Sequence, residues 1–142
     1  MRHGHSCKGR ISKAYRTWRN IISRCTDPNQ INYERYGGRG ITVCERWRTS
    51  FQAFLDNMGE PGKGLSIERK DNNAGYCPEN CVWATNSQQC RNRRSNRLIT
   101  WQGKTQCVMD WEEELGLPRL CLVKRLYRKW PLERAMTTPA RK

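Results

Sequence analysis

The chain has 142 residues, with 27 basic and 13 acidic side chains that give a net charge of +14, and 36% of its residues are hydrophobic. This length fits one domain or two small ones, and the low apolar content predicts a thin core in which six Trp and five Tyr carry much of the buried area. The sequence has neither the ~20-residue apolar run of a membrane span nor the apolar segment of a signal peptide. We therefore expect a cytoplasmic protein without membrane association, and the charge favours a polyanionic partner, nucleic acid first, over a protein that is merely basic.

The first quarter of the chain predicts a basic tail followed by a helix. Residues 1–11 are polar and basic, and we expect them to be flexible. From Ser12 onward apolar side chains recur at helical spacing, until Asp27-Pro28 ends the helix because Pro restricts the residue before it. The opposite face of this helix is basic and is either solvated or in contact with phosphates; its charged residues are Lys13, Arg16, Arg19 and Arg24.

Residues 33–58 predict a loop, a strand and a second helix. The segment YERYGGRG at 33–40 has three glycines and is expected to be a loop that leaves Arg39 well exposed. Residues 41–43 predict a short strand, and Trp47 is expected to pack onto the first helix. Ser50 is expected to cap a helix with one Phe-rich apolar face.

The next segment predicts two strands and a helix. LSIE at 65–68 and CVWA at 81–84 have the residue types of short strands, and DNNAG at 71–75 has the residue types of a turn. Thr85 or Asn86 can then cap a helix. The order of strand, loop, strand and helix predicts a compact ββα unit.

This unit, residues 65–93, resembles the HNH (ββα-metal, or His-Me finger) motif of phage homing endonucleases and their free-standing relatives. Residues 80–85, Asn-Cys-Val-Trp-Ala-Thr, match the second strand of that motif, and Glu68-Arg69 stands where the family has Asp-His. Gln89 falls at the helical position of the third motif residue, where Asn or His is usual. The resemblance implies a metal-dependent DNA endonuclease that acts inside a phage-infected bacterial host.

The resemblance also implies roles for five residues of the catalytic site. Glu68 and the amide oxygen of Gln89 would hold one Mg²⁺ or Mn²⁺ ion. Arg69 takes the place of the general base; a guanidinium does not accept a proton, but it can hold a phosphate. Asp71 is the nearest spare carboxylate for a base, and Asn80 is expected to pin the loop between the strands.

Arg69 keeps other functional interpretations open. One is a DNA-binding protein on the same scaffold that has lost cleavage and uses no metal. Another is an inhibitor that binds a host protein through its basic surface. The retained Glu68 and the intact scaffold favour the nuclease.

The eight cysteines are expected to be mostly buried thiols, because a free Cys behaves as a small apolar residue. A structural zinc ion on Cys77, Cys81 and Cys90 is the alternative. The paired Cys-x2-Cys spacing of most zinc sites is absent there, so we do not expect zinc.

Residues 98–142 predict a separate, smaller module. A hairpin is expected to turn at Gln102-Gly103, and two helices follow that are joined by Gly-Leu-Pro at 116–118. The second helix is basic, which makes the pair a helix-turn-helix candidate. Its expected core residues are Leu120, Val123, Leu126 and Tyr127.

This module resembles the small DNA-binding modules appended to homing nucleases. The match rests on Trp-x3-Leu-Gly at 111–116 and Arg-Leu-x3-Trp-Pro-Leu at 125–132. The alternative is a helical hairpin that touches no DNA. A last short helix is expected to end near Met136.

The sequence thus predicts an α+β protein with an HNH-like nuclease domain over residues 12–97 and a helix-turn-helix-like module over residues 98–142. The expected partner is double-stranded DNA. The run at 91–104 has five basic side chains and no acidic one, which suits contact with a DNA backbone. The residues expected to contact DNA, four of them facing outward from the second helix of the module, are Arg39, Arg91, Arg93, Arg94, Arg97, Arg119, Lys124, Arg125, Arg128 and Lys129.

Overall fold

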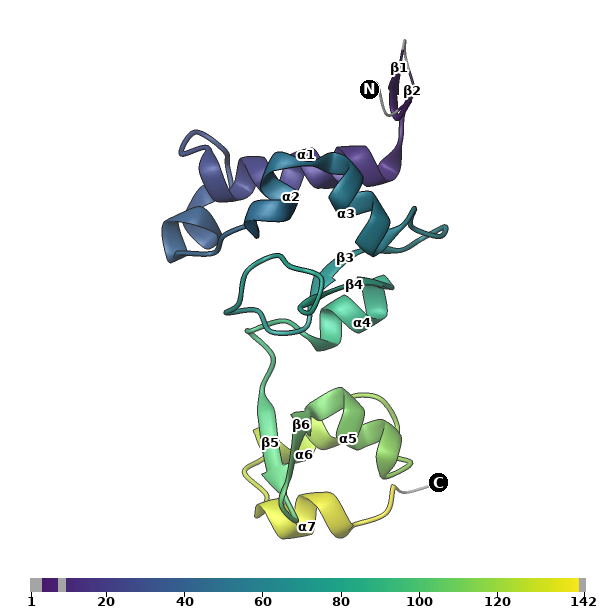
Figure 1. Cartoon of the computed structure of the whole chain (residues 1–142). Coiled ribbons are helices and arrows are strands. Elements are labelled where there is room, and N and C mark those ends of the chain that lie inside the picture. Colours follow the sequence, from purple (N-terminus) through teal and green to yellow (C-terminus); the bar gives the residue numbers. More distant parts are fainter. Residues whose placement is uncertain (1–3, 8–9, 141–142) are drawn as a thin grey trace. The chain divides into compact units, whose positions relative to one another are not determined.

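The computed structural model describes residues 4–7 and 10–140, and it is a mixture of helices and small sheets, as expected for an α+β protein (Figure 1). In this described part of the chain, the strands pair as three separate two-stranded antiparallel sheets. The chain divides into two compact units, Met1–Gln89 and Cys90–Lys142. This boundary falls inside helix α4 (Asn86–Arg91), a few residues before the division after residue 97 that the sequence suggests.

The first unit opens with a small hairpin and a long helix. Strands β1 (Ser6–Cys7) and β2 (Arg10–Ile11) pair, and the His5 ring lies 5.3 Å from that of Phe51, so the described part of the predicted flexible tail is folded; residues 1–3 and 8–9 lie outside the description. Helix α1 (Lys13–Thr26) begins and ends where the sequence predicts, because the hydroxyl of Ser12 accepts a hydrogen bond from the Tyr15 amide at 3.1 Å and Pro28 follows its end.

The glycine-rich loop is two 3-10 turns, η1 (Tyr33–Arg35) and η2 (Gly37–Arg39). Gly37 is required there, because a Cβ would lie 2.4 Å from the carbonyl oxygen of Cys25. The strand predicted at 41–43 is wrong. That segment makes one isolated bridge, between Val43 and Tyr76, because its partner is the compact loop after β3 rather than a strand.

Two helices, α2 (Glu45–Thr49) and α3 (Phe51–Met58), lie alongside α1 and close the core of the first unit (Figure 1). Ser50 caps α3 as expected, accepting a hydrogen bond from the Ala53 amide at 3.2 Å. The Trp18 indole of α1 donates to the Trp47 carbonyl at 2.6 Å, which confirms the packing of Trp47 on the first helix.

Strands β3 (Ser66–Arg69) and β4 (Cys81–Ala84) pair antiparallel with Glu68 opposite Val82, and α4 follows at once. The predicted strand, loop, strand and helix are therefore present in this order. Thr85 and Gln88 form a reciprocal cap at the start of α4, with the Gln88 side chain bonded to the Thr85 amide at 2.8 Å.

The second unit is a hairpin with three short helices. Strands β5 (Leu98–Trp101) and β6 (Lys104–Cys107) turn at Gln102 and Gly103, both with positive φ, as the sequence predicts. Helices α5 (Val108–Glu114), α6 (Cys121–Tyr127) and α7 (Leu132–Thr137) follow. The buried core of the second unit consists of Ile99, Val108, Trp111, Leu122, Ala135 and Met136.

Three of the four core residues predicted around α6 are wrong, and Leu126 alone packs against the core as expected. Leu120, Val123 and Tyr127 are 49%, 42% and 87% exposed, whereas Leu122 is fully buried. The cause lies in α5, where the buried Glu112 carboxylate accepts hydrogen bonds from the amides of Leu120 and Leu122 and fixes how α6 begins.

Among the residues that the structure describes, no helix is both long enough and apolar enough to cross a membrane.

The orientation of α6 predicts a contrast between two adjacent substitutions. Leu122→Ala should lower the free energy of unfolding by about 2–5 kcal/mol, because it opens a cavity in the core. The matched control Val123→Ala should lower the free energy of unfolding by about 0.5 kcal/mol or less, since that side chain faces solvent. Urea denaturation followed by circular dichroism measures both, and equal losses would contradict this orientation.

Candidate functional site

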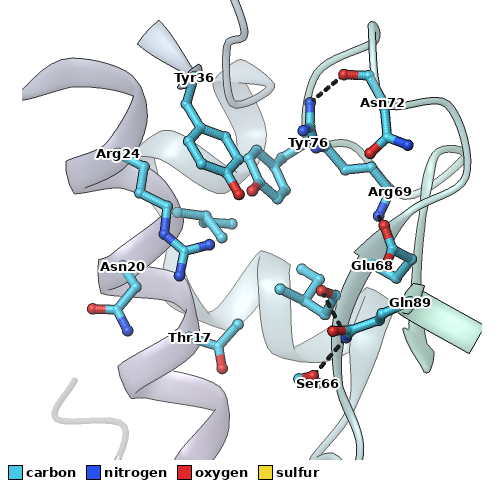
Figure 2. Close-up of a pocket in the computed structure, with 12 residues that line it drawn as sticks. Thr17, Asn20, Arg24, Tyr36, Ser66, Glu68, Arg69, Asn72, Tyr76 and Gln89 are labelled. Carbon is cyan, nitrogen blue, oxygen red and sulfur yellow. Dashed lines mark hydrogen bonds between the residues drawn. The ribbon is translucent and has the colours of Figure 1, made fainter. Parts of the chain in front are cut away.

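A polar pocket of about 340 Å³ lies in the first unit between α1 and β3 (Figure 2). The polar residues of its α1 wall are Thr17, Asn20 and Arg24, whose spacing of three and four residues places them on one helix face. Arg24 was expected on a basic helix face, and its position beside the ββα segment was not predicted. The signal was the row of polar side chains at helical spacing beside the apolar stripe.

The opposite wall brings Glu68 of β3 and Gln89 of α4 to the same pocket (Figure 2). Gln89 is held by its amide nitrogen, which donates to the Ser66 hydroxyl at 2.5 Å and to the Ile67 carbonyl at 3.5 Å. The Glu68 carboxylate accepts a hydrogen bond from the Arg69 amide at 3.0 Å. Two oxygen-bearing side chains expected to act together therefore share one cavity.

Arg69 has a buried guanidinium that holds the loop between β3 and β4. The residue is 7% exposed, and its Nη1 donates to the carbonyls of Asn72 at 3.0 Å and Ala74 at 2.9 Å. The guanidinium also lies 5.2 and 5.0 Å from the ring centroids of Tyr36 and Tyr76. Arg69 lines the pocket, and these contacts give it a structural role there.

Tyr76 and Asp71 are the other titratable side chains beside Arg69 that bear on proton transfer. Burial and the adjacent Tyr36 raise the pKa of Tyr76, so its phenol keeps its proton. Asp71 does not line the pocket; one of its carboxylate oxygens accepts a hydrogen bond from the Asn73 amide at 2.8 Å.

Asn80 ties the two ends of the loop together. Its side-chain oxygen accepts from the Asp71 amide at 2.8 Å, and its nitrogen donates to the carbonyls of Asp71 at 3.1 Å and Gly75 at 2.9 Å. With the residue 9% exposed, all three bonds are shielded from water. The side chain therefore holds the loop, whichever function the site has.

Arg39 is a third side chain that bonds to this loop, and the prediction that it is well exposed is wrong. It is partly buried, and its Nη2 donates to the Asn72 carbonyl at 2.9 Å and to the Asn73 side chain at 3.2 Å. The glycines beside it bend the chain back toward the loop, so the guanidinium meets backbone rather than open solvent.

The cysteines proposed for zinc do not form a ligand cluster. Within the described part of the chain, no group of three or more Cys, His, Asp or Glu residues is placed to hold a metal ion. Cys81 is buried, and burial raises the pKa of its thiol to about 11, while Cys77 and Cys90 are partly exposed. These residues are free thiols in the structure.

The basic residues expected to contact DNA are either held by other groups of the protein or exposed to solvent. Arg91 forms ion pairs with Asp110 at 3.1 Å and Glu113 at 2.7 Å. Arg125 is 7% exposed and donates to backbone carbonyls, so its expected outward orientation is wrong. The exposed members are Arg93, Arg94, Arg97, Arg119, Lys124, Arg128 and Lys129.

Comparison of the chain with protein-family models, curated proteins and solved structures gives no match.

The burial of Arg69 predicts a stability effect. Arg69→Met should lower the free energy of unfolding by about 2–4 kcal/mol, because two carbonyls of the loop lose the buried charged donor that satisfies them. The control Arg35→Met, at an exposed guanidinium, should change it by about 0.5 kcal/mol or less. If chemical denaturation gives equal values for the two variants, Arg69 does not hold the loop.

Proposed function

We propose that this chain is a metal-dependent DNA endonuclease of the HNH type, with a helix-turn-helix-like module in its second unit. The observation that carries the proposal is the placement of Glu68 and Gln89 in one polar pocket opposite Arg24. The strand, loop, strand and helix around them, with Asn80 on the loop, support it. The basic second unit supports double-stranded DNA as the partner.

The donor set fits a single hard cation. Mg²⁺ and Mn²⁺ sites that act on phosphates use one or two protein carboxylates and leave the other positions to water and substrate. Glu68 supplies one carboxylate, and Gln89, oriented through its amide nitrogen, has an oxygen as its remaining polar atom. When bound, such an ion would stabilise charge on the phosphate and the leaving oxygen.

The charges around the pocket favour a phosphate. Among the described residues that line it, Glu68 is the single carboxylate, whereas Arg24 and Arg69 are both guanidinium groups. Arg24, half-buried with its guanidinium 5.3 Å from the Tyr36 ring centroid, would orient a phosphate oxygen while Asn20 and Thr17 add polar contacts. The excess of positive charge means that DNA and cation should bind together rather than the cation alone.

The described lining of the pocket has no histidine to deprotonate the attacking water. Arg69, which also lines it, cannot take a proton. Hydroxide from bulk solvent would then be the nucleophile. Cleavage should be slow and its rate should increase with pH.

A second candidate is a DNA-binding protein that does not cleave. The observation that favours it is the use of Arg69 as a support for the loop, which removes the family's base from the pocket. This candidate needs the basic surfaces but no cation. The two candidates differ in the role of Glu68, which binds a cation in the endonuclease and has no such role in the DNA-binding protein.

The endonuclease proposal predicts that Glu68→Ala and Gln89→Ala abolish Mg²⁺- or Mn²⁺-dependent nicking of supercoiled plasmid, since each removes a cation ligand. Affinity for duplex DNA should change less than about threefold. The control Glu79→Ala removes an exposed carboxylate outside the pocket and should cleave normally. Wild-type rates in Glu68→Ala, or cleavage that persists in EDTA, would overturn the assignment.

The missing base predicts a distinct pH profile for Arg69→His. The wild-type rate should increase about tenfold per pH unit, whereas the variant rate should level off above an imidazole pKa of ~6.5. A positioned base contributes ~10²–10⁴-fold, partly offset here by the loosened loop. If wild type and variant both bind DNA and neither cleaves with any divalent cation, the non-cleaving candidate is correct.

A further inference from the structure

The second unit contains a basic pocket formed by α6, α7 and the chain that follows α7. Its volume is about 540 Å³, and Thr138 and Pro139 form part of one wall. Five cationic side chains line it, and no carboxylate does among the residues that the structure describes. These five are Arg119, Lys124, Arg125, Arg128 and Arg134.

Arg125 forms the fixed side of this pocket. Its Nη1 donates to the Ala135 carbonyl at 2.7 Å and its Nη2 to the Pro139 carbonyl at 2.9 Å. These bonds tie α6 to α7 and to the segment beyond it, so the pocket has a defined shape. A guanidinium kept nine-tenths buried also adds a positive charge that water screens poorly.

Trp130 positions a second guanidinium. The Arg134 guanidinium carbon lies 4.3 Å from the Trp130 ring centroid, and that of Arg125 lies 5.5 Å from it. Stacking holds Arg134 beside other positive charges that would repel it. An arginine held in this way loses less conformational freedom when it binds a phosphate.

The exposed side of the pocket is formed by three further cations. Lys124 of α6 and Arg128, which caps the end of that helix, are four residues apart and so lie on one face, and both are exposed. Arg119 reaches the pocket from the turn before α6. Cations from three segments therefore converge on one cavity, which is the arrangement that an anionic group requires.

The neighbouring face of α6 indicates the kind of anion. Val123 and Tyr127 are also four residues apart, and with Leu120 they form an exposed apolar strip beside the cationic face. A free inorganic anion offers nothing to such a strip. Duplex DNA offers a phosphate and, within one groove, apolar base edges and methyl groups.

We propose that the pocket bounded by Arg125, Arg134 and Trp130 binds one backbone phosphate of duplex DNA, and that Arg119, Lys124 and Arg128 complete the contact. This rests on the proposed DNA substrate but not on cleavage. It assigns Arg134 and Trp130 to DNA binding, and it makes Arg125 a positioning residue that shapes the pocket from within.

The test measures the affinity of the full chain for a labelled ~30-base-pair duplex by fluorescence anisotropy at several salt concentrations. Arg134→Gln and Arg128→Gln should each weaken binding, and the double variant should reduce the slope of log affinity against log salt by about 0.9, since one phosphate contact is lost. Arg48→Gln is the control: it removes one charge from the first unit, at an exposed side chain paired with Glu45, and should keep the slope. Arg125 is left unchanged because its loss would unfold the unit.

Two further arms separate the outcomes. Circular dichroism melting must show that each variant keeps its fold, and Trp130→Leu, which removes the stacking surface but no charge, should weaken DNA binding on a folded chain. If the pocket variants bind with the affinity and slope of Arg48→Gln, the pocket does not hold a DNA phosphate. Glu68→Ala should keep the wild-type slope whether or not it loses cleavage, because the phosphate pocket does not include the nuclease site.

Discussion

The candidate site depends on the loop between β3 and β4, and three side chains hold carbonyls of that loop. Asn80 donates to two of the carbonyls, Arg69 donates to two others, and Arg39 reaches the loop from the glycine-rich turn. A buried carbonyl without a partner costs about 1–3 kcal/mol, so these contacts decide whether the loop has one conformation. They also fix the strand end that carries Glu68.

Arg69 has contacts that a shorter side chain would not make. It donates to two carbonyls of the loop and lies against Tyr36 and Tyr76, a set of contacts that an imidazole is too short to reproduce. The residue therefore supports the loop, and it cannot accept a proton from water. The pocket keeps a carboxylate, an amide and a cation, which suit the binding of a phosphate together with a divalent ion.

Local signals in the sequence predicted the elements well, and long-range contacts explain what was missed. Ser12, Ser50 and the Gln102-Gly103 turn act on their own neighbours, so their roles were visible in the chain. The sequence alone does not distinguish a buried arginine from a solvated one. Arg39 and Arg125 find their carbonyls in other segments, and only the fold brings those segments together.

The proposed nuclease site requires that Glu68 and Gln89 hold one divalent cation beside a DNA phosphate. The anomalous scattering of manganese, measured on crystals of the protein with duplex DNA grown in Mn²⁺, locates such a cation. We expect one peak in the pocket, about 2.0–2.3 Å from a Glu68 oxygen and the Gln89 amide oxygen, near the distances of Mg²⁺ sites. DNA bound with no peak there, or a peak that excludes Glu68, would contradict it.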